Sequence, residues 1–131
     1  MTQSNQSNLT VLIADDEIEF ASTLVARLRL RNFAATMTNS GKATLSAIEK
    51  NQPDVLVLDL KMPDLDGLEV LASLHEKYPA LAVIILTGHG SFEAGRRGME
   101  LGAYDYIMKP VDLNLLMEKI EGAFQSKKTA G

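Results

Sequence analysis

The sequence has no cysteine, no long apolar stretch and no surplus of basic charge. The absence of cysteine excludes disulfide bonds and thiolate sites, and it favours a cytoplasmic location. No apolar stretch approaches the roughly 18 residues that a membrane-spanning helix needs, so no membrane association is expected. The formal net charge of -4 gives no basic field for nucleic acid, so this chain alone is not expected to bind it directly.

The chain has 131 residues, which is the usual size of one domain, and an ordinary balance of apolar and charged residues. Residues 1–8 are polar and lack the apolar region of a signal peptide, so they are predicted to form a flexible leader. Residues 126–131 are predicted to be a flexible tail. A single domain is therefore expected over residues 9–125, without an internal repeat or a linker.

Five apolar runs without alternation predict strands that are buried on both faces. They are Leu9–Asp15, Ala34–Thr38, Asp54–Asp59, Ala82–Thr87 and Tyr104–Met108. Apolar residues recur at helical spacing after the first, third and fifth runs, and residues 41–50 and 91–101 are predicted to form the remaining helices. The sequence therefore predicts an α/β fold, a single doubly wound (βα)5 domain with helices on both faces. Its five-stranded parallel sheet is expected in the order 2-1-3-4-5, since five units are too few for an eightfold barrel.

Polar side chains stand where four of these runs end. Asp15 ends the first and Asp16 follows it, Asp59 ends the third, Thr87 ends the fourth and Lys109 follows the fifth. The carboxyl ends of parallel strands lie along one edge of the sheet, and the first and third strands meet at the switch point of this order. Three acids, a hydroxyl and an amine are therefore expected in one crevice.

The chemistry of this crevice suits phosphoryl transfer. Neighbouring carboxylates raise one another's pKa unless a cation lies between them, and Mg²⁺ prefers one or two carboxylates with water and phosphate oxygens. An amine such as Lys109 can hold a phosphoryl oxygen, and the Thr87 hydroxyl can donate a hydrogen bond. Asp59 can accept the group as an aspartyl phosphate.

The pattern resembles the receiver domain of two-component response regulators, from about Leu9 to Phe124. The residues that carry the resemblance are Asp15-Asp16, Asp59, Met62-Pro63-Asp64-Leu65-Asp66-Gly67, Thr87-Gly88 and Lys109-Pro110. Each fragment alone is weak, but the ordered set on five strand–helix units is specific. Residues 87–90 and 102–106 are most similar to receivers of enhancer-binding transcriptional activators.

The resemblance implies a phosphoacceptor and a metal site. Asp59 accepts the phosphoryl group from a phosphohistidine on a sensor histidine kinase or a phosphotransfer protein. The implied cofactor is Mg²⁺, held by Asp16, Asp59 and the Lys61 carbonyl group, with Asp15 close by through water. Lys61 and His89, two residues after Asp59 and Thr87, are expected to tune the phosphoryl lifetime.

The resemblance also implies roles around the phosphoryl group. Thr87 and Lys109 bind its oxygens, and Thr87 with Tyr106 forms the switch. Gly67 and Pro110 shape loops, the bond before Pro110 being usually cis in the family. Taken without the family, Asp16 is equally a helix cap and Tyr106 a half-buried packing residue.

The implied function is a phosphorylatable signalling switch. Its output is a changed surface, formed by the helix at 91–101, the strand at 104–108 and the helix that starts at Leu113. This surface controls an effector domain or a partner protein, and homodimerisation on phosphorylation is a further option. The chain is not expected to be an enzyme, since it catalyses only its own phosphorylation and dephosphorylation.

Two other function classes were weighed. A Mg²⁺-dependent phosphohydrolase that forms an aspartyl phosphate on an outside substrate usually has a second acid two residues after the nucleophile, where this chain has Lys61. The chain also has no room for a cap domain. An inactive receiver-like adaptor is disfavoured by the intact set of acids, threonine and lysine.

The helix at 91–101 contains two glycines, Gly95 and Gly98, each of which costs about 0.8–1.0 kcal/mol relative to alanine. One interpretation is close packing on the sheet, with Phe92, Gly95 and Met99 on one face. The other is a helix near its folding limit that moves on phosphorylation. Arg96 and Arg97 are expected to face outward and to offer a contact to an acidic partner.

Overall fold

Strands and helices alternate along the whole chain in the computed structural model, which describes residues 9–88 and 92–130, without the side chains of 128–130. The elements are β1 (Thr10–Ala14), α2 (Ile18–Leu30), β2 (Ala34–Thr38), α3 (Gly41–Lys50), β3 (Val55–Asp59), α4 (Gly67–Lys77), β4 (Ala82–Thr87), α5 (Phe92–Glu100), β5 (Asp105–Met108) and α6 (Leu113–Ala130). All five predicted strands are present, with bounds that differ by at most one residue. The leader predicted at residues 1–8 lies outside the described residues.

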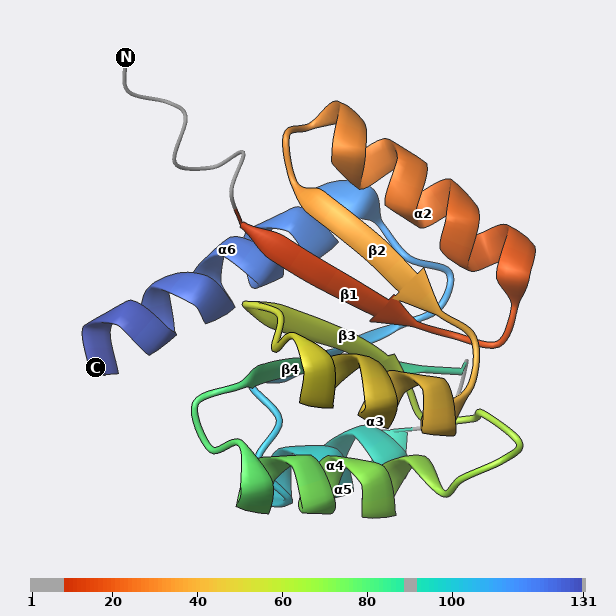
Figure 1. The fold of residues 1–131 in the computed structure, drawn as a ribbon, viewed down its shortest axis with the longest axis vertical. Coiled ribbons are helices and arrows are strands. Elements are labelled where there is room, and N and C mark those ends of the chain that lie inside the picture. The colour runs from red at the N-terminus through yellow and green to blue at the C-terminus, as the bar shows by residue number, and fades with distance from the viewer. Residues whose placement is uncertain (1–8, 89–91, 131) are drawn as a thin grey trace.

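The strands form one parallel sheet in the order β2-β1-β3-β4-β5, which confirms the predicted topology. The arrowheads of β1, β2 and β3 accordingly point toward the same edge of the sheet (Figure 1). Ala14 is paired with Leu58, and Asp59 with Leu86. This register sets the last residue of β3 between the ends of β1 and β4, so the loops after these strands share one crevice.

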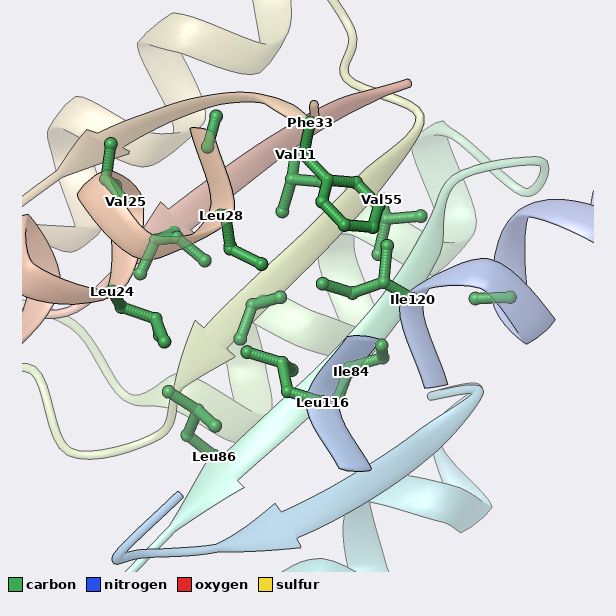
Figure 2. Packing of buried hydrophobic residues seen from close by; sticks show 14 of the residues in the cluster. Val11, Leu24, Val25, Leu28, Phe33, Val55, Ile84, Leu86, Leu116 and Ile120 are labelled. Atoms are coloured by element: carbon green, nitrogen blue, oxygen red, sulfur yellow. The ribbon is translucent and has the colours of Figure 1, made fainter. Parts of the chain in front are cut away.

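Alternate residues of each buried strand pack on opposite faces of the sheet. One face is covered by α2 and α6, whose Leu24, Leu28, Leu116 and Ile120 meet the strands (Figure 2). The other face carries α3, α4 and α5 (Figure 1). The central strand β3 is buried at every position, which holds its last residue in a fixed place.

Helix α6 extends through residues 126–130, where the sequence suggested a flexible tail. Its Lys127 amine donates to the Asp54 carbonyl oxygen at 3.0 Å, which ties this part of the helix to the sheet. No described helix is long and apolar enough to cross a membrane.

Helix α5 approaches the sheet closely through its two glycines. Gly95 and Gly98 are both buried, whereas Phe92 is 65% and Met99 39% exposed. Of Phe92, Gly95 and Met99, which were expected to pack on the sheet together, only Gly95 is buried, and the second buried position is Gly98. A side-chain carbon added at Gly98 would overlap Cδ1 of Ile85, so close packing accounts for this glycine.

The expectation for Arg96 also needs correction. Its guanidinium group faces outward, but it bonds to Glu93 at 2.5 Å and to Glu100 at 2.9 Å on the same helix. The spacing of three and four residues favours both pairs. Arg96 is therefore already paired, while Arg97 is exposed.

Candidate functional site

Asp59 lies at the centre of the crevice formed by the carboxyl ends of the strands. It is the last residue of β3 and only 4% exposed. Its Oδ1 accepts a hydrogen bond from the Lys61 backbone N–H at 3.0 Å, and its Oδ2 lies 3.4 Å from the Lys109 amine. The Lys61 side chain is exposed, so only the backbone of this residue reaches the carboxylate.

Three carboxylates converge here. Asp15, Asp16 and Asp59 each offer an oxygen atom, and these atoms lie within 4.8 Å of one another. Asp15 is fully buried and Asp16 is exposed. Burial raises the pKa of Asp15, and the nearby Asp59 adds to this, although the Glu17 N–H and Lys109 act in the opposite direction.

This cluster fits a hard divalent cation. Oδ1 of Asp15 accepts from the Glu17 N–H at 2.9 Å, and Oδ2 is paired with the Lys109 amine, 2.9 Å away. One lysine does not balance the clustered carboxylates, and a divalent cation would stabilise them further. The donor set consists of oxygen atoms alone, as Mg²⁺ requires.

Lys109 lies among four groups. Its amine is 2.7 Å from Glu17 Oε1, 2.9 Å from Asp15 Oδ2 and 3.4 Å from Asp59 Oδ2. The amine also lies 4.6 Å from the centre of the Phe20 ring. Burial alone would lower the pKa of Lys109, but the three carboxylates outweigh burial and raise it well above its ordinary value. Lys109 is therefore a permanent positive charge at the site.

Thr87 brings a hydroxyl group to the same edge of the sheet. It ends β4, is 2% exposed, and its Oγ1 has no hydrogen-bond partner in the described part of the chain. Its carbonyl oxygen accepts from the Lys109 N–H at 2.8 Å, which fastens the end of β4 to the loop after β5. A buried hydroxyl without a partner can donate a hydrogen bond to an incoming oxygen atom.

Tyr106 lies apart from this cluster, on the face of the sheet covered by α5. The residue is half-buried, and a side-chain carbon at Gly95 would lie 2.8 Å from its Cδ2 atom. The missing side chain of Gly95 thus leaves room for the ring. His89 lies outside the described residues.

The loop after Asp59 is held at two points. A side-chain carbon at Gly67 would lie 2.5 Å from the Leu60 backbone, and Asp66 caps α4 by accepting from the Leu68 N–H. Asp64 accepts from the Gly41 and Lys42 N–H groups at the start of α3, which joins this loop to a helix more than twenty residues earlier in the chain. These bonds hold the pKa of Asp64 below its ordinary value, and the bond from Lys42 contributes more than the bond from Gly41.

The peptide bond between Lys109 and Pro110 is cis, as the resemblance implied. Two further residues of the site were not predicted. Glu17 follows Asp15-Asp16 directly, a position that indicated only the start of a helix, and it makes the shortest contact to Lys109. Asn39 donates to the Asp15 carbonyl oxygen at 2.9 Å from the loop after β2, a contact that no short-range sequence signal announces.

Comparisons with known proteins agree with this geometry. Residues 11–121 match the family described as the response regulator receiver domain. The chain is 34% identical over 113 residues to the DNA-binding transcriptional regulator NtrC of Proteus hauseri, covering 86% of this chain and 24% of that protein. It is 31% identical over 116 residues to the transcriptional regulatory protein ZraR of Escherichia coli K12, covering 88% and 26%.

A solved structure shows the same fold. The crystal structure of a response regulator receiver domain protein from Clostridium thermocellum superposes with a TM-score of 0.89 at 31% identity, covering 95% of this chain and all of that one. By contrast, the chain spans about a quarter of the length of the NtrC and ZraR relatives, since it covers 24% and 26% of them.

Proposed function

The chain belongs to the response regulator receiver domain family, whose members are phosphorylatable signalling switches, and we propose that Asp59 is its phosphoacceptor. The observation that carries this proposal is the setting of the Asp59 carboxylate. It is buried, it faces the Lys109 amine, and it shares its edge of the sheet with two further acids. The donor is a phosphohistidine of a sensor histidine kinase or of a phosphotransfer protein.

The transfer itself needs positioning more than covalent chemistry. An Asp59 oxygen attacks the phosphorus atom, the O–P bond forms, and the N–P bond to the histidine breaks with its electron pair leaving on nitrogen. The Lys109 amine and the Thr87 hydroxyl donate to the phosphoryl oxygens as charge spreads over them. Thr87 moves toward the phosphoryl group, and Tyr106 turns with it as the second part of the switch.

The cofactor of the proposed reaction is Mg²⁺. Asp16, Asp59 and the Lys61 carbonyl group would hold it, with Asp15 close by, and it would offset the charge of the carboxylates and the phosphoryl oxygens. The oxygen-only donor set of the three converging carboxylates supports this assignment.

The output is a changed surface on α5, β5 and α6 that controls an effector domain or a partner protein. Four large apolar side chains are exposed on or beside these elements: Phe92, Met99, Tyr104 and Leu115. Such side chains suit a protein partner or a second copy of the chain on phosphorylation. The proposed location is the cytoplasm, and the proposed domain covers residues 9–125.

Hydrolysis of an outside substrate has no support. The residue two positions after Asp59 is Lys61, whose side chain is exposed and carries no acid. The family to which the chain belongs is a signalling family. Catalysis is therefore limited, in this proposal, to the protein's own phosphorylation and dephosphorylation.

Incubation with acetyl phosphate and Mg²⁺, followed by intact-protein mass spectrometry, tests the proposal. One phosphoryl adduct per chain is expected, and none when Mg²⁺ is removed with a chelator. Steady release of phosphate from varied phosphate esters without an adduct would instead support a hydrolase. An unchanged mass would support an inactive adaptor.

A further inference from the structure

Glu17 stands in an unusual relation to the start of α2. It occupies the N-cap position, yet its side chain makes no capping hydrogen bond. The side chain instead reaches the Lys109 amine, 92 residues further along the chain, at 2.7 Å. This is the shortest of the three carboxylate contacts to that amine, while the contact to Asp59 is the longest at 3.4 Å.

Phe20 supports the same arrangement from one turn further along α2. The centre of its ring lies 4.6 Å from the Lys109 amine, a distance at which a cation is attracted to the face of an aromatic ring. Glu17 and Phe20 are three residues apart, so they lie on one side of the first turn. The start of α2 therefore offers Lys109 both a carboxylate and an aromatic face.

The three carboxylates differ in how easily they can release the amine. Asp15 is fully buried, and its Oδ2 has no directed hydrogen bond among the described residues, so losing Lys109 would leave that oxygen without compensation. The side chain of Glu17 is 62% exposed, and water can replace the amine there at little cost. Glu17 is therefore the partner that can exchange.

We propose that Glu17 is a positioning residue that holds Lys109 in the resting protein and competes with the incoming phosphoryl oxygen for its amine. This inference rests on the proposed function. Three carboxylates lie within 3.4 Å of the ammonium group at rest, and the group has three N–H donors, so a phosphoryl oxygen on Asp59 competes with these carboxylates for the amine. Glu17 thereby lowers the affinity of the site for a phosphoryl group without touching that group.

Binding of beryllofluoride in the presence of Mg²⁺ tests the proposal, because this anion adds to an aspartate as a phosphoryl group does. Titration calorimetry compares the parent with Glu17→Gln, Glu17→Asp and Glu19→Gln. Glu17→Asp keeps the charge but is one methylene shorter, which withdraws the carboxylate from the amine. Glu19→Gln removes the same charge from an exposed residue of the same turn, which makes no described contact with Lys109.

Tighter binding by about two- to fivefold is expected for both Glu17 variants, the span that an exposed ion pair contributes, with Glu19→Gln close to the parent. Melting temperatures should stay similar, because no side-chain cap is lost at Glu17.

Three outcomes overturn the proposal. In the first, Glu17→Gln binds no tighter than Glu19→Gln, and in the second it binds more weakly than the parent. In the third, Glu17→Asp behaves like the parent, which would assign the effect to the charge of Glu17 and not to its contact. The control Asp59→Asn distinguishes a failure of the role proposed for Glu17 from a failure of the proposed function. If the parent binds beryllofluoride no better than Asp59→Asn does, the proposed function itself is contradicted.

Discussion

An aspartate lies at each end of strand β3, and the two carboxylates differ in their hydrogen bonds. Asp54, just before the strand, has an Oδ2 that accepts from the Thr10 N–H at 2.9 Å and from the Thr10 hydroxyl at 3.1 Å. The Asp54 N–H donates to the same hydroxyl at 2.9 Å. Asp59, the last residue of the strand, accepts one backbone bond, from Lys61, and lies among other acids.

The difference between these ends separates a structural carboxylate from a reactive one. At the amino end, hydrogen bonds from Thr10 of the neighbouring strand satisfy the charge of Asp54, and Lys127 lies 4.0 Å from its Oδ1. At the carboxyl end, Lys109 is shared by Asp15, Glu17 and Asp59, and the Thr87 hydroxyl has no hydrogen bond among the described residues. The residue type is the same at both ends, so the surroundings assign the role.

The largest expected effect is on phosphoryl uptake. Asp59→Asn should abolish the mass increase from acetyl phosphate, because the amide cannot accept the group. Asp54→Asn should leave uptake unchanged, because Asp54 lies at the opposite end of β3. Intact-protein mass spectrometry of both variants checks this, and full labelling of Asp59→Asn would break the comparison.

The next effect is stabilisation by Mg²⁺. A cation that binds only the folded protein adds about 2.7 kcal/mol to the free energy of unfolding at a hundredfold excess over its Kd. Asp16→Ala should remove this response, since Asp16 belongs to the carboxylate cluster. Asp54→Ala should keep it. Thermal melts with and without Mg²⁺ measure the effect, and a parent whose melting temperature ignores Mg²⁺ contradicts the metal site.

A smaller effect is expected on the free energy of unfolding, and here Asp54 should matter more than Asp59. Asp54→Ala should lower the free energy of unfolding by about 1–2 kcal/mol, because hydrogen bonds to a charged group are lost. Asp59→Ala should leave the metal-free protein at least as stable as the parent, because it removes one of three repelling acids. Denaturant unfolding in a chelator compares the two variants. Greater destabilisation by Asp59→Ala than by Asp54→Ala would show that Asp59 is the structural residue.

The smallest expected effect is a pH dependence at the carboxyl end. Burial raises the pKa of Asp15, so the folded protein binds this proton more tightly than the unfolded chain. Ionised Asp15 therefore costs stability above its raised pKa, and the cost disappears as the pH falls toward the ordinary value of 3.8. Metal-free Asp15→Asn should thus be more stable than the parent at neutral pH, with a gain that shrinks in acid.

Asp64 provides the matched control of opposite sign. Its pKa is lowered by backbone hydrogen bonds, so its stabilisation is present at neutral pH and is lost as the pH falls through the lowered value. Asp64→Asn should therefore be less stable than the parent at neutral pH and equal to it in strong acid. Unfolding curves between neutral pH and strong acid test Asp15→Asn and Asp64→Asn. If both substitutions change the free energy of unfolding in the same direction, the opposite pKa shifts of Asp15 and Asp64 are contradicted.

The strands and their order could be predicted because the apolar runs are continuous and end in polar residues. The same feature placed Asp15, Asp59 and Thr87 on one edge, since parallel strands align their carboxyl ends. The structure adds contacts that join residues far apart in the sequence, such as Glu17 with Lys109 and Asp64 with the start of α3. These depend on how the loops fold back, and helix and strand periodicity carry no information on that.

Helix α5 shows where local rules were misleading and where they were enough. Helix propensity makes Gly98 unfavourable, but only the packing against Ile85 shows why no side chain fits there. The pairs of Arg96 with Glu93 and Glu100 could have been predicted from their spacing of three and four residues. The outward direction of Arg96 was predicted correctly, but these two pairs within the helix were not considered.

The central claim, that Asp59 is the reactive aspartate of β3, is tested most directly by locating the phosphoryl group. Borohydride reduces an aspartyl phosphate to homoserine but leaves phosphorylated hydroxyl groups and free carboxylates unchanged. Peptide mass spectrometry of the parent, after acetyl phosphate, Mg²⁺ and borohydride, should find homoserine at position 59 and aspartate at positions 15, 16 and 54. Homoserine at any of these three positions, or at none, would contradict the account.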